Sequence, residues 1–187
     1  MKWLVLLYVG GLSLFHQTEI DSSSDRFLVW SEGRNLTEGD FQLKKNVRLP
    51  YAALSYITIR PEVKNKNGMI EVVIEATFDT KRSWMKKNSV SQRLISHEQG
   101  HFDIAELHAR IIRKEISQSK ITSKNVHRKV NRIYKKVMKE LNCYSKQYDD
   151  ITDFSRNEAI QGEWIERIRT ELDSLAEFSD PIVYLNN

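Results

Sequence analysis

The chain has a single cysteine, Cys143, among its 187 residues. One cysteine excludes an internal disulfide framework, which small exported domains often need. Proline and glycine are also scarce, with three and seven residues, and no linker rich in them divides residues 26–187. Repeats and low-complexity tracts are absent as well. With 40% hydrophobic residues, these absences indicate one domain that its own core can stabilise.

A large excess of one charge is also lacking. The chain has 29 Lys and Arg residues against 25 Asp and Glu. Residues 1–17 contain only Lys2, so the remainder has 28 against 25, a net charge of +3. We therefore expect no nucleic-acid partner, because nucleic-acid-binding domains are typically far more basic.

Long apolar runs are absent except at the start of the chain. Lys2 is followed by an apolar run from Trp3 to Phe15, interrupted only by small residues, and then by polar residues. This pattern is typical of a secretory signal peptide and is short for a membrane helix. We expect residues 1–17 to be a signal peptide, with an uncleaved anchor as the alternative. The remainder, 18–187, is then an exported domain, periplasmic or extracellular, without stable membrane insertion.

The first part of this domain has the periodicity of β-strands. Segments 27–31 and 52–60 are rich in β-branched and aromatic residues. In 69–79, apolar residues alternate with mostly polar ones, as in a strand with one face in the core. Residues 64–68, KNKNG, have the composition of a tight turn, so the last two strands should form a hairpin.

The period changes from two to 3.6 after these strands. A capping box that starts with Ser89 predicts a helix running to Ile116. A second helix is expected over 123–143, and a third from a capping box that starts with Ser155. The predicted fold class is α+β, with a small N-terminal antiparallel sheet and hairpin followed by three long helices.

Basic residues gather on the second predicted helix. The same helix has a full apolar face, so we expect the basic residues to form its solvated outer surface. Contact with anionic lipid or an acidic polymer is the alternative. The basic residues are Lys124, His127, Arg128, Lys129, Arg132, Lys135, Lys136 and Lys139.

The first predicted helix contains the motif H-E-x-x-H, in which His97 and His101 are four residues apart. Residues at this spacing lie on one face of a helix, so both imidazoles can bind one Zn²⁺. Glu98 can then take a proton from a zinc-activated water as this water attacks a carbonyl. The sequence therefore predicts two metal ligands and a catalytic base. The alternative is two partly buried helix histidines beside an incidental glutamate.

A third histidine in this helix, His108, should not bind the same metal. It shares the face of His101 but lies about 10.5 Å further along the axis. We expect it to pack beside the site. Asp103 and Glu106 point away from the histidine face, so neither is a candidate ligand.

The third ligand must come from another segment. Four carboxylates cluster between the second and third predicted helices, and Glu158 already belongs to a helix cap. Asp149 and Asp153 remain as candidates. The alternative is an acidic turn that binds no metal. The four carboxylates are Asp149, Asp150, Asp153 and Glu158.

At this point the chain resembles a known group, the bacterial family called domain of unknown function 922. Members of this family are predicted secreted zinc-dependent proteases. The resemblance extends over most of residues 27–168, and the helix 97–110 is its most specific element. The segments that carry it are VWSEGRNLTEGDF (29–41), HEQGHFDIAELHAR (97–110), YDDIT (148–152) and QGEW (161–164).

The resemblance implies a single zincin-like metallohydrolase domain, with His97 and His101 as metal ligands and Glu98 as the base. Many members carry a histidine shortly after the YD-x-x-T element, where this chain has Phe154. If that histidine is a ligand elsewhere, this protein must use another residue or bind metal poorly. We prefer Asp149 as that residue.

Two functions follow from these features. The first is a secreted zinc metallopeptidase acting on peptides or proteins, in which the strand 69–79 could pair with an extended substrate. The second is an exported, non-catalytic binding module with a structural or degenerate metal site. Phe154 favours the second function. Glu98 argues against it, because a structural zinc site prefers four protein ligands and needs no base.

Overall fold

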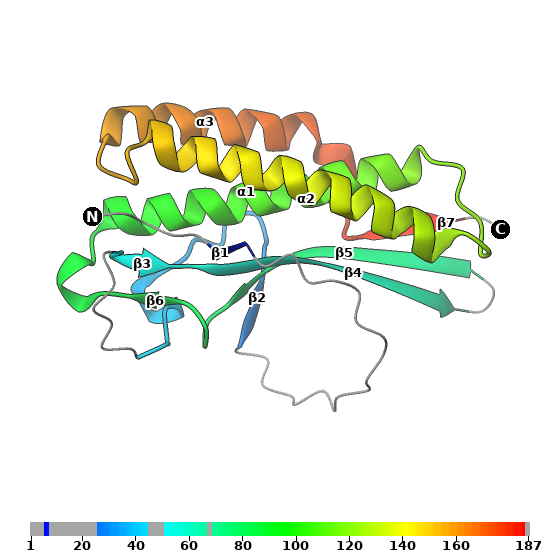
Figure 1. The fold of residues 1–187 in the computed structure, drawn as a ribbon, viewed down its shortest axis with the longest axis horizontal. Helices are drawn as coiled ribbons and strands as arrows, with labels where there is room; N and C mark the ends of the chain where they lie inside the picture. The colour runs from blue at the N-terminus through cyan, green and yellow to red at the C-terminus, as the bar shows by residue number, and fades with distance from the viewer. Residues whose placement is uncertain (1–5, 8–25, 45–50, 67–68, 186–187) are drawn as a thin grey trace.

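A sheet and three long helices form a layered α+β structure (Figure 1). α1 (Gln92–Ser117) lies directly on the sheet, and α2 (Val126–Ile151) and α3 (Glu158–Ser174) cover its other side. α1 is therefore the middle layer. The predicted signal peptide lies outside the described residues apart from Leu6–Leu7. This computed structural model describes residues 6–7, 26–44, 51–66 and 69–185.

The predicted hairpin is confirmed. β4 (Tyr56–Lys66) and β5 (Met69–Asp79) pair antiparallel, with Lys66 opposite Met69. Alternate residues of β5 point into the core, as the period of two predicts. These buried residues are Ile70, Val72, Ile74, Ala76 and Phe78.

β5 is an inner strand, and this position contradicts its suggested pairing with a substrate. β4 lies on one side, while β2 (Phe27–Val29) and β7 (Ile182–Leu185) both pair antiparallel with the other side. Between those two strands, the Ala76 carbonyl accepts from Trp30 N at 2.9 Å. Both long edges of β5 are thus used, so a peptide could not pair with it.

The sheet also differs from the expected N-terminal antiparallel arrangement in two respects. β7 comes after all three helices, so the end of the described chain returns to complete the sheet. β1 (Leu6–Leu7) pairs parallel with the start of β4, with Leu6 opposite Tyr56. The strand order along the main path is β1-β4-β5-β2.

The predicted strand 52–60 is divided into two at Ser55. β3 (Ala53–Leu54) pairs with β6 (Trp84–Met85) in a separate two-stranded sheet, and β4 begins with Tyr56. Ser55 is therefore fixed between strands of two sheets. Three short 3₁₀ helices complete the described fold: Glu38–Asp40, Lys87–Ser89 and Ala176–Phe178.

For both helices, the N-cap lies two residues after the predicted one. Ser91, not Ser89, caps α1, and its side chain accepts from Leu94 N at 3.2 Å. Asn157, not Ser155, caps α3. Ser155 has a φ of 70°, whereas an N-cap residue needs an extended backbone.

The second helix is longer than predicted, and this changes where the acidic residues lie. It ends at Ile151 instead of Cys143, because Leu141, Ser145 and Tyr148 continue its buried face. Asp149 consequently lies in the last turn of α2 and not in a loop. Its side-chain direction is thereby fixed by the helix.

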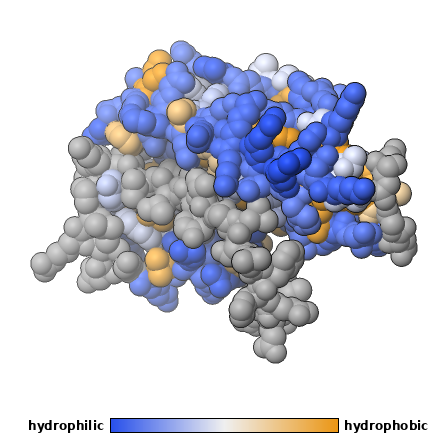
Figure 2. All heavy atoms as spheres, turned by 45° about the vertical axis from the view of Figure 1, so that its right-hand side comes forward, coloured by the Kyte–Doolittle hydropathy of each residue, from blue (hydrophilic) through white to orange (hydrophobic). Residues whose placement is uncertain are grey.

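The exterior is mostly polar. Figure 2 shows a face on which apolar residues lie singly or in small groups among hydrophilic ones. The basic residues of α2 are exposed, apart from a partly buried Lys129, on the side opposite its apolar face. In the part of the chain that the structure describes, no helix has both the length and the apolar character to cross a membrane.

The central position of α1 forces its charged residues to pair in the interior. Glu106 accepts from Arg113 Nη2 at 2.9 and 3.0 Å and from Arg110 Nε at 3.1 Å. Arg113 also donates to the carbonyls of Phe178 and Ser179. Burial raises the pKa of Glu106 and lowers that of Arg113, although each partner opposes the shift of the other. This cluster joins α1 to the segment that leads into β7.

We expect Arg113→Met to lower the free energy of unfolding by about 3 kcal/mol, because it leaves Glu106 buried with less compensation. Urea denaturation would measure the change. Arg156→Met is the control, since Arg156 is exposed and pairs with exposed Asp153; its effect should stay within about 1 kcal/mol. Equal effects of the two substitutions would contradict the role assigned to the buried cluster.

Candidate metal centre

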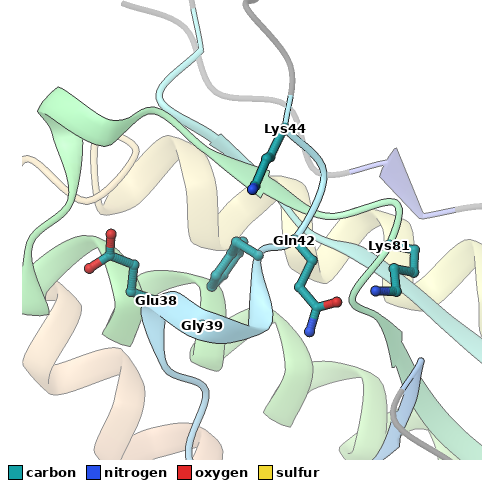
Figure 3. Close-up of a pocket in the computed structure, with 6 residues that line it drawn as sticks. Glu38, Gly39, Gln42, Lys44 and Lys81 are labelled. Atoms are coloured by element: carbon teal, nitrogen blue, oxygen red, sulfur yellow. The ribbon is translucent and has the colours of Figure 1, made fainter.

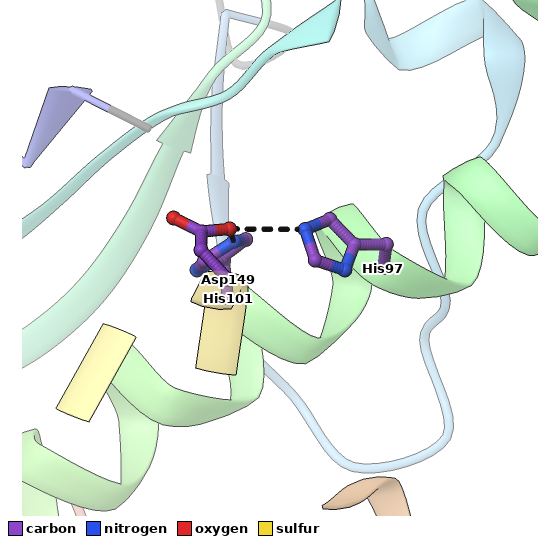
Figure 4. A group of neighbouring side chains, drawn as sticks. All are labelled: His97, His101 and Asp149. Carbon is purple, nitrogen blue, oxygen red and sulfur yellow. Dashed lines mark hydrogen bonds and ion pairs between the residues drawn. The ribbon is translucent and has the colours of Figure 1, made fainter. Parts of the chain in front are cut away.

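Three potential metal ligands converge from two helices. His97 and His101 lie on successive turns of α1, and Asp149 faces them from the last turn of α2 (Figure 4). Asp149 Oδ1 lies 3.1 Å from His97 Nε2 and 3.0 Å from His101 Nε2. The three candidate ligand atoms all lie within 4.8 Å of one another. α2 runs back along α1, so residues about 50 positions apart in sequence meet here.

Burial strengthens the electrostatic interactions among the residues of this cluster. Both histidines are 0% exposed, and the Asp149 side chain is 13% exposed. Burial disfavours a charged His101, but Asp149 and then Glu98 outweigh it, so the pKa of His101 is raised. Burial likewise opposes ionisation of Asp149, yet the two histidines lower its pKa strongly. The cluster thus favours a carboxylate at Asp149, the form that binds a cation.

The donor set fits a transition-metal ion. Two imidazole nitrogens and one carboxylate oxygen are the protein ligands of many catalytic zinc sites, which leave a further position for water. One feature departs from the usual pattern: Nδ1 of His97 and Nδ1 of His101 are buried without hydrogen-bond partners among the described residues. Metal-binding histidines more often donate from this second nitrogen to a carboxylate or carbonyl.

Tyr148 orders the two imidazoles. Its ring stacks on His97 with centroids 4.7 Å apart and meets His101 edge-on at 5.0 Å. Its hydroxyl is buried without a partner in the described structure, and burial, then Glu98 and Asp149, raise its pKa. The tyrosine is therefore a neutral wall of the site.

Gly100 provides the space that Tyr148 occupies. A Cβ atom at position 100 would lie 2.4 Å from Tyr148 Oη and 2.8 Å from Cζ. Real Cβ atoms do not approach other atoms so closely, and the buried ring has little room to withdraw. The glycine inside H-E-Q-G-H is thus explained by a residue on another helix. Sequence reasoning missed this pair, whose only signals were a helical glycine and the YD element.

Glu98 lies beside the cluster in a buried position, with 2% of its surface exposed. Its carboxylate accepts a hydrogen bond from the hydroxyl of Ser55, which is also buried. No motif in the sequence pointed to Ser55. The contact depends on the two sheets that meet at that residue.

The other residues considered from the sequence lie outside the cluster. His108 donates or accepts through Nδ1 at the Ile104 carbonyl, 2.8 Å away, and packs on Tyr144. Burial lowers the pKa of His108. Asp153 is exposed and pairs with Arg156. Of the two aspartates considered as third ligands, the structure brings only Asp149 to the histidines.

The opposite face of α1 holds the segment that begins with Trp30. Trp30 Nε1 donates to Asp103 Oδ1 at 2.8 Å, and Gln99 Nε2 donates to the same oxygen at 2.7 Å. Gln99 Oε1 in turn accepts from Leu36 N at 2.7 Å. A residue inside H-E-x-x-H therefore attaches the 30–36 segment to the back of the helix. Within the VWSEG segment (29–33), this contact gives Trp30 a structural role.

Among the hollows of the described structure, two of more than 500 Å³ lie away from the cluster. One, of about 560 Å³, lies beside Trp30 and Asp103 on the back of α1. The other, of about 530 Å³, lies at the 3₁₀ helix Glu38–Asp40 (Figure 3). Its labelled side chains point in different directions and do not converge on one point. Neither hollow contains a member of the histidine cluster.

These observations define a class: an α+β protein with a candidate three-residue metal site on its central helix. Residues 67–156 match the family described as "Bacterial protein of unknown function (DUF922)". The resemblance drawn from the sequence is thereby confirmed over this part of the chain. The match includes all three cluster residues but not the VWSEG and QGEW segments. No curated protein and no solved structure matches the chain.

We expect Asp149→Ala to weaken metal binding by more than the roughly 10- to 100-fold typical of losing a residue that only hydrogen-bonds a ligand. Asp153→Ala should leave binding unchanged, because Asp153 is exposed and outside the cluster. Competition with a fluorescent chelator would give both affinities after zinc is supplied. If Asp153→Ala lowered zinc affinity and Asp149→Ala did not, the third ligand would be Asp153 and not Asp149.

We expect Gly100→Ala to destabilise the protein by about 1–3 kcal/mol, since the added methyl group overpacks against Tyr148. Metal affinity should fall with it, because Tyr148 holds the His97 ring. Gly162→Ala on α3 is a matched control: a Cβ there meets nothing within 4 Å, so this change should stabilise by about 1 kcal/mol. Thermal unfolding of both variants would test the contrast, and a neutral Gly100→Ala would contradict it.

Proposed function

We propose that this protein is a zinc-dependent hydrolase, specifically an exported metallopeptidase. The observation that carries the proposal is the convergence of His97, His101 and Asp149 beside a buried carboxylate, Glu98. Three protein ligands with an adjacent base suit a catalytic site, whereas a structural site would use four ligands and no base. The DUF922 match and the signal-peptide pattern of residues 1–17 support a bacterial protein that acts after export.

Each residue of the candidate site would have a distinct chemical role. His97, His101 and Asp149 would hold the metal through Nε2, Nε2 and a carboxylate oxygen. Zinc, when bound, supplies a Lewis acid that makes water acidic near neutral pH and polarises a carbonyl. Glu98 then accepts the proton of the attacking water and returns it to the leaving amine. Tyr148 and the surrounding core exclude water from the sides of the imidazoles.

The second candidate function is a binding module that retains the fold without turnover. Two observations favour it: the unpartnered Nδ1 atoms of both histidines, and Phe154 at the place where many family members carry a histidine. An intact metal site without hydrolysis of any peptide in a broad library would support this function over the peptidase.

We expect Glu98→Gln to retain zinc but to lower peptide hydrolysis by about 10²- to 10⁴-fold, because the amide cannot accept the proton. A library of internally quenched fluorescent peptides and metal analysis of the same samples would provide the two readouts. Glu115→Gln is the control on the same helix, since Glu115 pairs with Lys136 far from the cluster. Full activity of Glu98→Gln would rule out the assigned base.

A further inference from the structure

Glu98 makes one hydrogen bond within the described residues. Its Oε2 accepts from the Ser55 hydroxyl, and its Oε1 has no hydrogen-bond partner in the same part of the chain. A serine hydroxyl has only one proton to donate. The contact therefore distinguishes the two oxygens of a carboxylate that otherwise rotates easily, because the terminal torsion of a glutamate has a broad energy profile.

Ser55 is itself held firmly by the strands around it. It lies between β3 and β4 and is 0% exposed. The next residue, Tyr56, donates from its backbone N to Ser83 Oγ at 2.9 Å, and Ser83 Oγ donates to the Asp79 carbonyl at 2.8 Å. Strands flank Ser55 on both sides, and rigid elements place a polar group more accurately than a free loop does. The hydroxyl thus approaches Glu98 from a fixed backbone position.

We propose that Ser55 is a positioning residue for Glu98, whose hydroxyl holds Oε2 and leaves Oε1 as the oxygen that accepts the proton. The proposal rests on the proposed function, since it concerns a base at work. It assigns a role in the site to a residue outside H-E-x-x-H and outside the matched segment 67–156.

A purely structural Ser55 would behave differently. If the side chain only filled space, Ser55→Ala would leave the orientation of the Glu98 carboxylate unchanged. If Ser55 positions the carboxylate, its removal lets the carboxylate rotate, and every process that needs a fixed acceptor becomes less favourable. The effect must then disappear when Glu98 is replaced, because Ser55 acts only through it.

Acetohydroxamic acid is a suitable probe that requires no peptide turnover. It binds zinc through two oxygens and gives up a proton that a neighbouring carboxylate can accept. Its dissociation constant would be measured by calorimetry on the zinc-loaded full chain, for the wild type, Ser55→Ala, Glu98→Gln and the double variant. Zinc content would be determined in each sample.

We expect Ser55→Ala to keep its zinc and to bind the hydroxamate about tenfold more weakly or worse, as for a lost hydrogen bond to a charged group. In the Glu98→Gln background, the same substitution should cause no further loss. Ser145→Ala is the matched control, because Ser145 is buried but its hydroxyl has no partner in the described structure. It should bind the hydroxamate like the wild type.

Undiminished binding by Ser55→Ala, or an equal loss in the Glu98→Gln background, would overturn the proposal. So would a zinc-loaded wild type that does not bind the hydroxamate. The peptidase is judged separately. Coupling between Ser55 and Glu98 without peptide hydrolysis would preserve the role of Ser55 and reject the peptidase, whereas hydrolysis without coupling would do the reverse.

Discussion

The burial of α1 between the sheet and two other helices is the constraint on which the rest of the structure depends. A helix covered on both sides can carry polar side chains only if each finds a partner, because an unpaired buried polar group is costly. α1 nonetheless carries histidines, glutamates, an aspartate and arginines along its length. Several of the buried ones therefore bind another segment of the chain, whereas His108 bonds to a carbonyl of α1 itself.

Four such attachments lie along the helix. At its start, the two histidines meet Asp149 of α2, and Glu98 meets Ser55 between β3 and β4. On the opposite side, Asp103 binds the segment that begins with Trp30. Further along, Glu106 and its arginines bind the chain that leads into β7. The candidate metal ligands thus follow the same rule as these other polar groups of the buried helix: each lies against a polar group of another segment.

The chemistry of the proposed site follows from the same burial. In a water-poor environment, Asp149 remains ionised because the histidines beside it lower its pKa. A cation placed among these groups would replace the imidazole proton that Asp149 favours, since two neutral imidazoles and one carboxylate are good ligands for zinc. Glu98 lies close enough to the cluster to raise the pKa of His101. This proximity is consistent with the role of a base.

The sequence alone predicted the features that depend on local periodicity. The β5 alternation, the hairpin and the helix carrying H-E-x-x-H follow from patterns within a few residues. The predicted end of the second helix was wrong because YSKQYDDI has only one strongly apolar residue, Ile151, and the burial of this segment depends on contact with α1 and α3. Ser55, Tyr148 and the central position of β5 could not be predicted, since each depends on pairing between distant segments.

The central claim is that a metal binds to the two histidines of α1 and to Asp149 of α2. X-ray absorption spectroscopy of the zinc-loaded protein tests it most directly, because it reports the ligand atoms around the metal. The account predicts one zinc per chain with two imidazole nitrogens and at least one oxygen in the coordination shell. A shell without imidazole, a sulfur ligand from Cys143, or no bound zinc at all would contradict it.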